Sequence, residues 1–443
     1  MDNGRPAEAE PTLVRALGVR AVAANIVNST IGSGIFVLPA AVAAILGSSA
    51  ILAYAICLAV TALVALCYAE LGSRVDAPGG SYAYIEKAFG PCAGYVANVM
   101  MWLGTHVFSG GAVAAIFVAS IAEMVPALGS PGARAAMLIA MFGGFALVNV
   151  RGVSSGNRLV ETLTAAKLAP IVLLVVAGAW AVHPANLLWD HAPTFADLGR
   201  ASLLLFFAFT GIENAMTLSG ELRDPEVTVP RGILVGLGTV AALYAGSHLV
   251  AQGILGPGLS LEKAAPLAAT AGHAFGGWAR TLLLVTASVS TFGCISGDIL
   301  AAPRLLYAVA RDGLAPRRLG AVHPRYRTPH VAIWTHSALC CGFALIGSFQ
   351  SLAILSASIT LLSYLACALA AIALRRRDVR LTHRPFLAPG GYVVHVLACV
   401  MTGTLLASTT GPEVRDVAIL IVCAYGMYVV SSATNRRRRV VPS

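Results

Sequence analysis

The chain has 443 residues, of which 57% are hydrophobic and only 11% are charged, and its mean hydropathy is +0.78. These few charged side chains cannot cover the surface of a soluble protein of this size. The composition therefore excludes an ordinary soluble domain and favours an integral membrane protein. The net charge of +10 does not call for nucleic acid as a partner, because the basic residues collect in loops between apolar runs.

Twelve apolar runs are each long enough to cross the ~30 Å hydrocarbon layer of a bilayer. These runs are 16–45, 49–71, 92–121, 134–151, 159–182, 199–221, 232–255, 276–309, 329–348, 351–374, 391–409 and 415–434. They predict an all-α integral membrane fold of about 12 transmembrane helices. The transporter domain would span residues 16–434, between a cytoplasmic N-terminal segment, 1–15, and a cytoplasmic basic tail, 435–443.

The lysines and arginines predict the orientation of the chain. When both termini are placed in the cytoplasm, 24 of the 30 basic residues fall on the inner side. The positive-inside rule then predicts cytoplasmic N- and C-termini, a location in the cell inner membrane and some attraction to anionic lipid.

Cysteines and histidines show no familiar ligand pattern. The nine cysteines lie in or beside apolar runs without a C-x-x-C pair, and the ten histidines show no zinc-type spacing on one helix face. We therefore expect no metal, no cofactor and no disulfide framework. Convergent catalytic groups are also missing from the pattern, so the chain is not expected to be an enzyme.

The first apolar run is interrupted by Gly32-Ser33-Gly34. Such a break leaves backbone N–H and C=O groups without partners inside the membrane, where a zwitterion could satisfy both kinds of group. The sixth run has a similar break at Gly211. Two broken helices five spans apart predict two inverted repeats, about 16–182 and 199–374, followed by two further helices at about 391–434. The alternative is that these glycines only allow close helix packing.

Four segments resemble the amino acid–polyamine–organocation (APC) transporters, which include the bacterial arginine/agmatine antiporter and the L-type amino acid transporters. They are Ile31-Gly32-Ser33-Gly34-Ile35-Phe36, Pro78-Gly79-Gly80-Ser81-Tyr82-Ala83-Tyr84, Phe209-Thr210-Gly211-Ile212-Glu213 running on to Gly220-Glu221 and Arg231, and Ala310-Arg311-Asp312-Gly313-Leu314-Ala315-Pro316. The resemblance implies a LeuT-like fold with helices 1 and 6 broken, and a small-molecule amino acid or amine as substrate.

The resemblance also implies a substrate site. Backbone N–H groups after the first break would bind the substrate carboxylate, carbonyl groups at both breaks would accept from its ammonium, and Phe207 would act as a lid or, alternatively, only pack. The implied substrate-binding set is Thr30, Ile31, Gly32, Ser33, Gly34, Ser109, Phe207, Thr210, Gly211 and Asp298.

Two of these positions differ from the arginine/agmatine pattern. Ser109 stands where an asparagine would contact a guanidinium, and Asp298 stands where a tryptophan would line the pocket. The first change argues against arginine, and the second argues for some cationic substrate. Asp298 could instead pair with Lys167 or another buried donor, and His106 could line a cavity or simply pack.

Lys167 and Glu213 are charges inside apolar runs, where charges are costly. The resemblance places the Lys167 ammonium at the sodium position of sodium-coupled relatives, so transport is expected to be sodium-independent, with protons as a candidate coupling ion. Lys167 could also only brace its helix. For Glu213, a proton-linked role and structural hydrogen bonding both stay open.

These features predict a secondary active transporter, a permease or exchanger of amino acids that works by alternating access. One alternative is an antiporter of cationic amino acids and their amines or polyamines, and another is a nutrient sensor built on a transporter scaffold. The sequence leaves open which substrate is carried, whether transport is exchange or proton symport, and whether the protein is a monomer or a homodimer.

Overall fold

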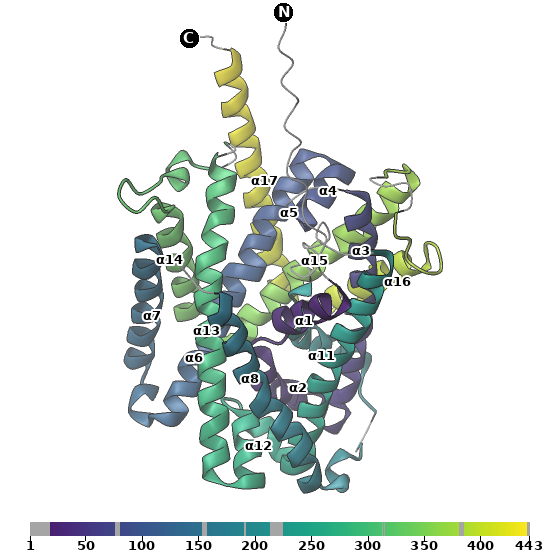
Figure 1. The fold of residues 1–443 in the computed structure, drawn as a ribbon, viewed down its shortest axis with the longest axis vertical. Helices are drawn as coiled ribbons and strands as arrows, with labels where there is room; N and C mark the ends of the chain where they lie inside the picture. The colour runs from purple at the N-terminus through teal and green to yellow at the C-terminus, as the bar shows by residue number, and fades with distance from the viewer. Residues whose placement is uncertain are drawn as a thin grey trace, which may run out of the picture.

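The computed structural model describes residues 18–75, 80–152, 157–189, 192–212, 225–311, 313, 315–380 and 385–440, without the side chains of 157–167, 225–227, 229 and 433–440. Helices make up the regular secondary structure of these ranges, and none of these ranges contains a strand. Figure 1 shows a helical bundle with α4 and the end of α17 at one end and α12 at the other.

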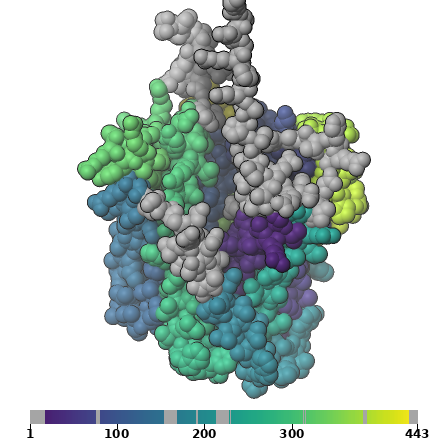
Figure 2. Space-filling view, in the orientation of Figure 1, coloured from purple at the N-terminus to yellow at the C-terminus, as the bar shows by residue number. Residues whose placement is uncertain are grey.

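The first membrane-crossing unit is a broken helix followed by a long one. Its elements are α1 (Val19–Thr30), η1 (Gly34–Phe36), α2 (Leu38–Leu46), η2 (Gly47–Ala50) and α3 (Ile51–Arg74). Pro39 lies in the first turn of α2, where its missing N–H removes no helical hydrogen bond. α1 lies across the middle of the bundle, and its residues reach the surface there (Figures 1 and 2).

The next helices follow as α4 (Ser81–Phe89), α5 (Pro91–Met101), η3 (Trp102–Phe108), α6 (Ser109–Met124), η4 (Pro126–Gly129), α7 (Pro131–Arg151), α8 (Asn157–Gly178), η5 (Ala179–Ala181) and η6 (Pro184–Leu187). The η3 segment has π-helical hydrogen bonding and interrupts the α-helix from Pro91 to Met124. Segments of this kind are frequent at functional sites, and η3 carries His106.

The second broken helix opens the following group. Its elements are α9 (Phe195–Phe206), η7 (Phe207–Phe209), α11 (Pro225–Leu255), η9 (Gly256–Leu261), α12 (Pro266–Phe275) and α13 (Gly277–Arg311). Thr194 caps α9 by accepting a hydrogen bond from the N–H of Asp197 at 3.1 Å. After η7, Thr210 is extended and Gly211 has a φ of +105°.

The remaining elements are η10 (Arg317–Gly320), α14 (His330–Ile346), α15 (Phe349–Arg376), α16 (Val393–Leu406) and α17 (Gly411–Val440). α15 begins with a reciprocal capping box between Ser348 and Ser351. Its side chains form much of the buried core, whereas those of α17 are largely exposed. Exposed valines such as Val422 and Val430 suit contact with lipid.

Among the described residues, seven helical stretches are long and apolar enough to cross a membrane. They are Leu38–Arg74, Pro91–Met124, Pro131–Arg151, Pro230–Leu261, Gly277–Arg311, Phe349–Arg376 and Gly411–Ser432. Shorter apolar helices lie at Leu168–Ala181, His330–Ile346 and Val393–Leu406. The predicted all-α membrane fold is confirmed, while the count of twelve crossings stays a prediction.

Both predicted interruptions are present, between α1 and η1 and after η7. The inverted relation of the two repeats stays a prediction. Several positions used in the sequence analysis lie outside the described residues: the N-terminal segment 1–15, Pro78, Gly79, Glu213, Gly220, Glu221, Asp312, Leu314 and the last three residues of the tail.

Candidate functional site

The two helix breaks lie against each other. A Cβ atom on Gly34 would stand 3.2 Å from the Cβ of Ala208 in η7 and 3.0 Å from Leu38 Cδ1. A Cβ atom on Gly211 would stand 2.5 Å from the carbonyl oxygen of Ser29, and its positive φ also favours glycine. Glycine at both positions therefore lets the breaks approach at a distance that a side chain would prevent.

The backbone N–H groups leave the α-helical pattern at the first break. The N–H of Ile31 still donates to Val27 O at 2.9 Å, whereas that of Gly32 turns back to Thr30 O at 2.9 Å. Ser33 and Gly34 stand at the start of η1, where an N–H group has no acceptor within the helix. Both residues are buried.

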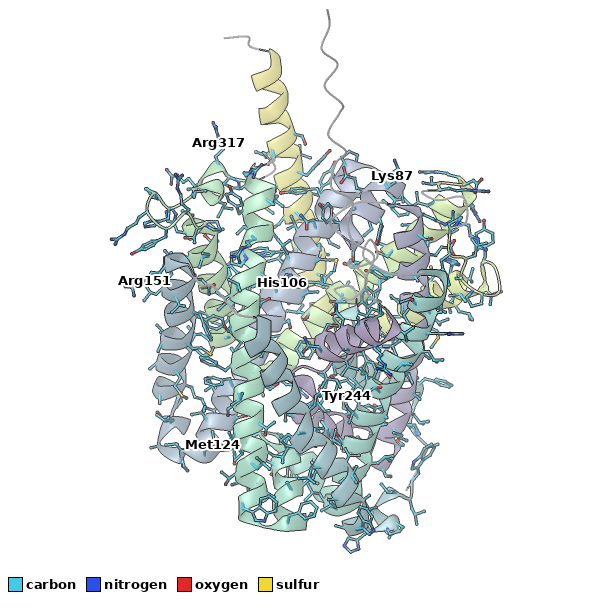
Figure 3. All side chains as sticks on the ribbon, in the orientation of Figure 1. Lys87, His106, Met124, Arg151, Tyr244 and Arg317 are labelled. Carbon is cyan, nitrogen blue, oxygen red and sulfur yellow. The ribbon has the colours of Figure 1, made fainter. Side chains whose placement is uncertain are left out.

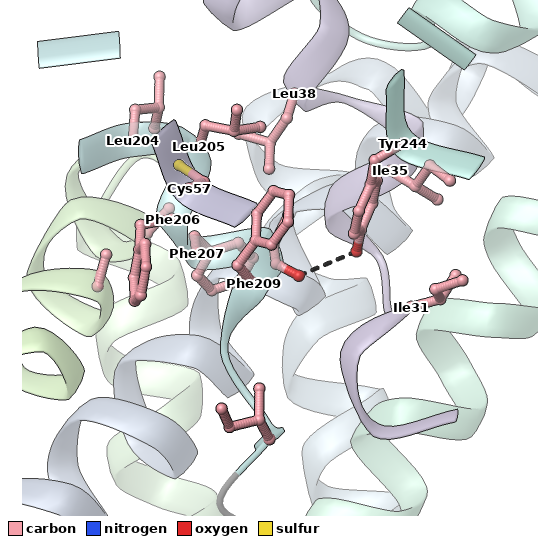
Figure 4. Close-up of a cluster of buried hydrophobic side chains, with 14 of the residues drawn as sticks. Ile31, Ile35, Leu38, Cys57, Leu204, Leu205, Phe206, Phe207, Phe209 and Tyr244 are labelled. Atoms are coloured by element: carbon pink, nitrogen blue, oxygen red, sulfur yellow. Dashed lines mark hydrogen bonds between the residues drawn. The ribbon is translucent and has the colours of Figure 1, made fainter. Parts of the chain in front are cut away.

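Tyr244 of α11 connects the two breaks. Its hydroxyl lies 2.9 Å from Thr30 O and 3.0 Å from Ala208 O, so carbonyl groups on both sides share its one hydrogen. The side chain is buried among apolar neighbours and its ring lies 5.3 Å from that of Phe209 (Figure 4). The hydroxyl thus satisfies acceptors that the interrupted helices leave without helical donors.

One polar group at the break has no such partner. The hydroxyl of Thr30 is buried and has no hydrogen-bond partner among the described residues. Such a group costs free energy unless something binds it. A role for this hydroxyl in binding substrate stays a prediction.

Phe207 lies in η7, directly before the second break, and is 6% exposed. Its ring meets that of Phe349 edge to face, with centroids 5.9 Å apart. Its carbonyl oxygen accepts a hydrogen bond from the Thr210 hydroxyl at 2.9 Å and keeps a second lone pair. A role as a lid stays a prediction.

Asp298 of α13 is held by two histidines. Its Oδ1 lies 2.6 Å from His106 Nδ1 of η3, and its Oδ2 lies 3.0 Å from His336 Nε2 of α14. These bonds tie Asp298 to η3 and α14 rather than to either break. Ser109 is half-buried at the start of α6, one residue before Gly110, whose Cβ would stand 3.5 Å from Asp298 Oδ2.

Two predicted coupling residues have little structural description. Lys167 belongs to α8, but its side chain is outside the described part of the chain. Glu213 lies directly beyond Ile212, where the described range ends. Their roles stay predictions.

A buried carboxylate outside the breaks escaped the sequence analysis. Glu70 of α3 is fully buried and accepts from Arg74 Nη2 at 2.9 Å, from Arg375 Nη1 at 3.4 Å and from the N–H of Ala388 at 3.0 Å. His395 Nε2 of α16 lies 3.3 Å from the same carboxylate. We call these residues the Glu70 cluster; it joins α3, α15 and α16.

An apolar cavity of about 240 Å³ lies elsewhere, between α5, α13, α14 and α17. Its lining includes Tyr95, Trp102, Leu305, Thr335 and Met427, and no lining residue comes from α1, η1 or η7. Its walls offer almost no polar surface for a carboxylate or an ammonium group. The cavity is therefore not the candidate site for a zwitterion.

The helical fold, its long apolar stretches and the two touching breaks define a multi-pass membrane protein. The chain belongs to the amino acid permease family, whose sequence profile matches residues 17–430. This confirms the expected membership of the APC superfamily and identifies the chain as a transporter rather than an enzyme.

Three relatives illustrate the similarity. An uncharacterized transporter of Mycobacterium tuberculosis is 32% identical over 73% of this chain and 72% of its own length. The serine/threonine exchanger SteT of Bacillus subtilis is 28% identical over 82% of this chain and 84% of its own. The human Asc-type amino acid transporter 1 is 29% identical over 86% of this chain and 76% of its own.

Proposed function

We propose that this permease is a secondary active transporter of small neutral amino acids that works by alternating access. The observation that carries the proposal is the contact between the two breaks, at Gly34 with Ala208 and at Gly211 with Ser29. Backbone groups of both broken helices meet there, as expected for a midplane substrate site between two repeats.

Each end of a zwitterion has a partner in this proposal. The N–H groups of Ser33 and Gly34 bind the carboxylate, since they begin a helix and have no acceptor within it. The carbonyl groups of Ile31 and Thr210 accept from the ammonium. Phe207 covers the bound molecule, and the Thr30 hydroxyl supplies one further polar contact.

A neutral side chain is favoured over a cationic one. Both oxygens of Asp298 accept hydrogen bonds from histidines, so a cationic substrate would have to displace one of these partners. Two relatives are named as a serine/threonine exchanger and an Asc-type amino acid transporter, which also favours small amino acids. The cationic alternative rests on Asp298 alone.

Lys167 supports transport without sodium. It lies within α8, in an apolar stretch of the chain. A sodium ion bound ~4 Å from its ammonium would meet a repulsion of about 4 kcal/mol at an effective dielectric constant of about 20. An ammonium group at this place would supply the positive charge that a coupling ion supplies elsewhere, with protons as the candidate coupling ion.

The distribution of charge supports an inner-membrane location with both termini in the cytoplasm. Lys87 and Arg317 lie toward the end of the bundle opposite Met124 (Figure 3). The positive-inside rule places the end with Lys87 and Arg317 in the cytoplasm. Glu123 and Arg280, which form an ion pair at 2.6 Å, then lie toward the outer side.

Uptake into proteoliposomes tests the proposal. The purified protein is given labelled serine, threonine, alanine, leucine, arginine or agmatine, with empty or substrate-loaded vesicles, in sodium or choline buffer. We expect saturable uptake of the small neutral amino acids in both buffers. A larger signal in loaded vesicles identifies exchange. Uptake confined to arginine or agmatine, or strict dependence on sodium, would contradict the proposal.

A further inference from the structure

Three metal-ligating side chains meet between α13 and α14. Asp298 Oδ2 lies 3.0 Å from His336 Nε2, and Cys340 Sγ lies 3.5 Å from the same nitrogen. One ligand atom from each of the three residues lies within 4.8 Å of the other two. His336 and Cys340 are buried, and they stand four residues apart on one face of α14.

We propose that Asp298, His336 and Cys340 bind a divalent transition-metal ion of the zinc type. A tetrahedral zinc site separates its oxygen and nitrogen ligands by about 3.3 Å and its nitrogen and sulfur ligands by about 3.6 Å, given the usual bond lengths. The observed separations are close to these values. The three residues reach such an arrangement with small adjustments of their side chains.

The donor types select the metal. Thiolate and imidazole favour zinc, cobalt or copper, whereas calcium and magnesium prefer an all-oxygen shell. On binding, the Cys340 thiol gives up its proton to solvent, because the thiolate is the ligand. His336 takes the tautomer with its proton on Nδ1, so that Nε2 stops donating to Asp298 Oδ2 and is free to bind the ion. The Asp298 carboxylate and the Cys340 thiolate then balance the two positive charges of the ion. This balance matters within the apolar interior, where an unbalanced charge is costly.

Neighbouring residues complete the site. His106 Nδ1 lies 2.6 Å from Asp298 Oδ1 and so holds the carboxylate with its other oxygen toward His336. Hydrogen bonds of this kind from the outer shell orient metal ligands. A Cβ atom on Gly110 would stand 3.4 Å from Cys340 Sγ and 3.5 Å from Asp298 Oδ2. Glycine leaves space next to both ligands, where a water molecule can fill the fourth position.

Cobalt substitution tests the site without a transport assay. The full-length protein, purified in detergent with a tag that contains no histidine, is titrated with Co²⁺ and its absorption is recorded. We expect about one ion per chain, a near-ultraviolet thiolate-to-cobalt band, and loss of that band on adding Zn²⁺. Cys340→Ser should abolish the band, whereas the matched variant Cys341→Ser, at the adjacent half-buried cysteine, should keep it.

The remaining variants separate ligands from their support. His106→Gln alters only the outer shell and should weaken metal binding by roughly 10- to 100-fold without removing the thiolate band. His336→Gln and Asp298→Asn each remove a ligand and should weaken binding more than His106→Gln does. His323, which is half-buried near the end of the bundle, would bind cobalt without a sulfur ligand, so only the thiolate band reports on this site.

Zinc-edge X-ray absorption of the wild-type protein provides a second measurement that needs no variant. One sulfur in the zinc shell is expected. A shell without sulfur, a folded wild type that shows no thiolate band, or a band that survives in Cys340→Ser would overturn the proposal. Amino acid uptake is measured separately, so failure here leaves the proposed transport function standing.

Discussion

The hydroxyl of Tyr244 donates a hydrogen bond to the carbonyl oxygen of Thr30 over 2.9 Å, directly before the first helix break. The same hydroxyl reaches Ala208 O beside the second break at 3.0 Å. One side chain of α11 therefore holds both breaks in their present relation. If alternating access changes the distance between the two broken helices, at least one of these bonds must break.

Tyr244→Phe is expected to reduce transport and stability together. The substitution removes the hydroxyl from Ala208 O and from Thr30 O, of which Thr30 O keeps the Gly32 N–H, and an unsatisfied buried group costs about 1–3 kcal/mol. The protein should insert normally but melt at a lower temperature and take up substrate several-fold more slowly in proteoliposomes. Tyr425→Phe, on the exposed face of α17, is the matched control. Equal behaviour of the two variants would show that the bridge is dispensable.

Gly34→Val is expected to abolish uptake without preventing membrane insertion. A branched side chain would collide with Leu38 and Ala208, which already stand at contact distance from a single Cβ atom, and would fill the break. Gly34→Ala should be impaired less. Uptake and membrane content are measured together, with Gly143→Val as control, because a Cβ atom there meets no neighbour. Near wild-type uptake by the Gly34→Val protein would remove the break from the substrate site.

Asp298→Asn distinguishes a structural carboxylate from a substrate contact. Because both oxygens accept from histidines, we expect the variant to affect neutral and cationic amino acids by the same factor. The measurement is competition of each substrate class against labelled serine. A loss of about 1–3 kcal/mol confined to cationic substrates, the range for a charge-assisted hydrogen bond, would instead place Asp298 in the substrate site.

Glu70→Gln should destabilise the protein strongly. The variant leaves Arg74 and Arg375 near a neutral group in a buried setting, and breaking such a pair costs about 3–5 kcal/mol. Thermal or denaturant unfolding in detergent gives the value. The control is Asp378→Asn, because the Asp378 pair with Arg380 is exposed and contributes little. A small change in the free energy of unfolding for Glu70→Gln would contradict this prediction and would mean that solvent reaches the arginines of the Glu70 cluster in the variant.

Lys167→Met tests the coupling proposal. The variant keeps the length of the side chain and deletes its charge, so it should slow the return of the empty carrier while exchange is less affected. Wild-type transport should persist in choline and vary between about pH 5 and 8, and the variation should flatten in the variant. Lys263→Met, at an exposed position, is the control. If wild-type transport did not vary with pH, proton coupling through Lys167 would be contradicted, and the residue would act only as a fixed charge.

The sequence alone predicted the membrane fold and the positions of the two breaks. Both follow from local rules: long apolar runs must form helices in hydrocarbon, and Gly32-Ser33-Gly34 and Gly211 weaken a helix wherever they occur. Family membership followed from four short motifs, two of which contain the same glycines. These properties depend on residues close together in the chain, so they can be read without knowing how the helices pack.

Packing alone decided which distant side chains meet. Tyr244 lies 214 residues after Thr30. No spacing in the sequence indicates that its hydroxyl contacts the carbonyl groups of both Thr30 and Ala208. The partners of Asp298 come from η3, 192 residues before it, and from α14, 38 residues after it. His336 and Cys340 do not stand out as a pair in the sequence, because a histidine and a cysteine four residues apart can act as metal ligands only when a third donor faces them. Asp298 supplies that donor from a separate helix, and only the tertiary packing of α13 against α14 brings it there.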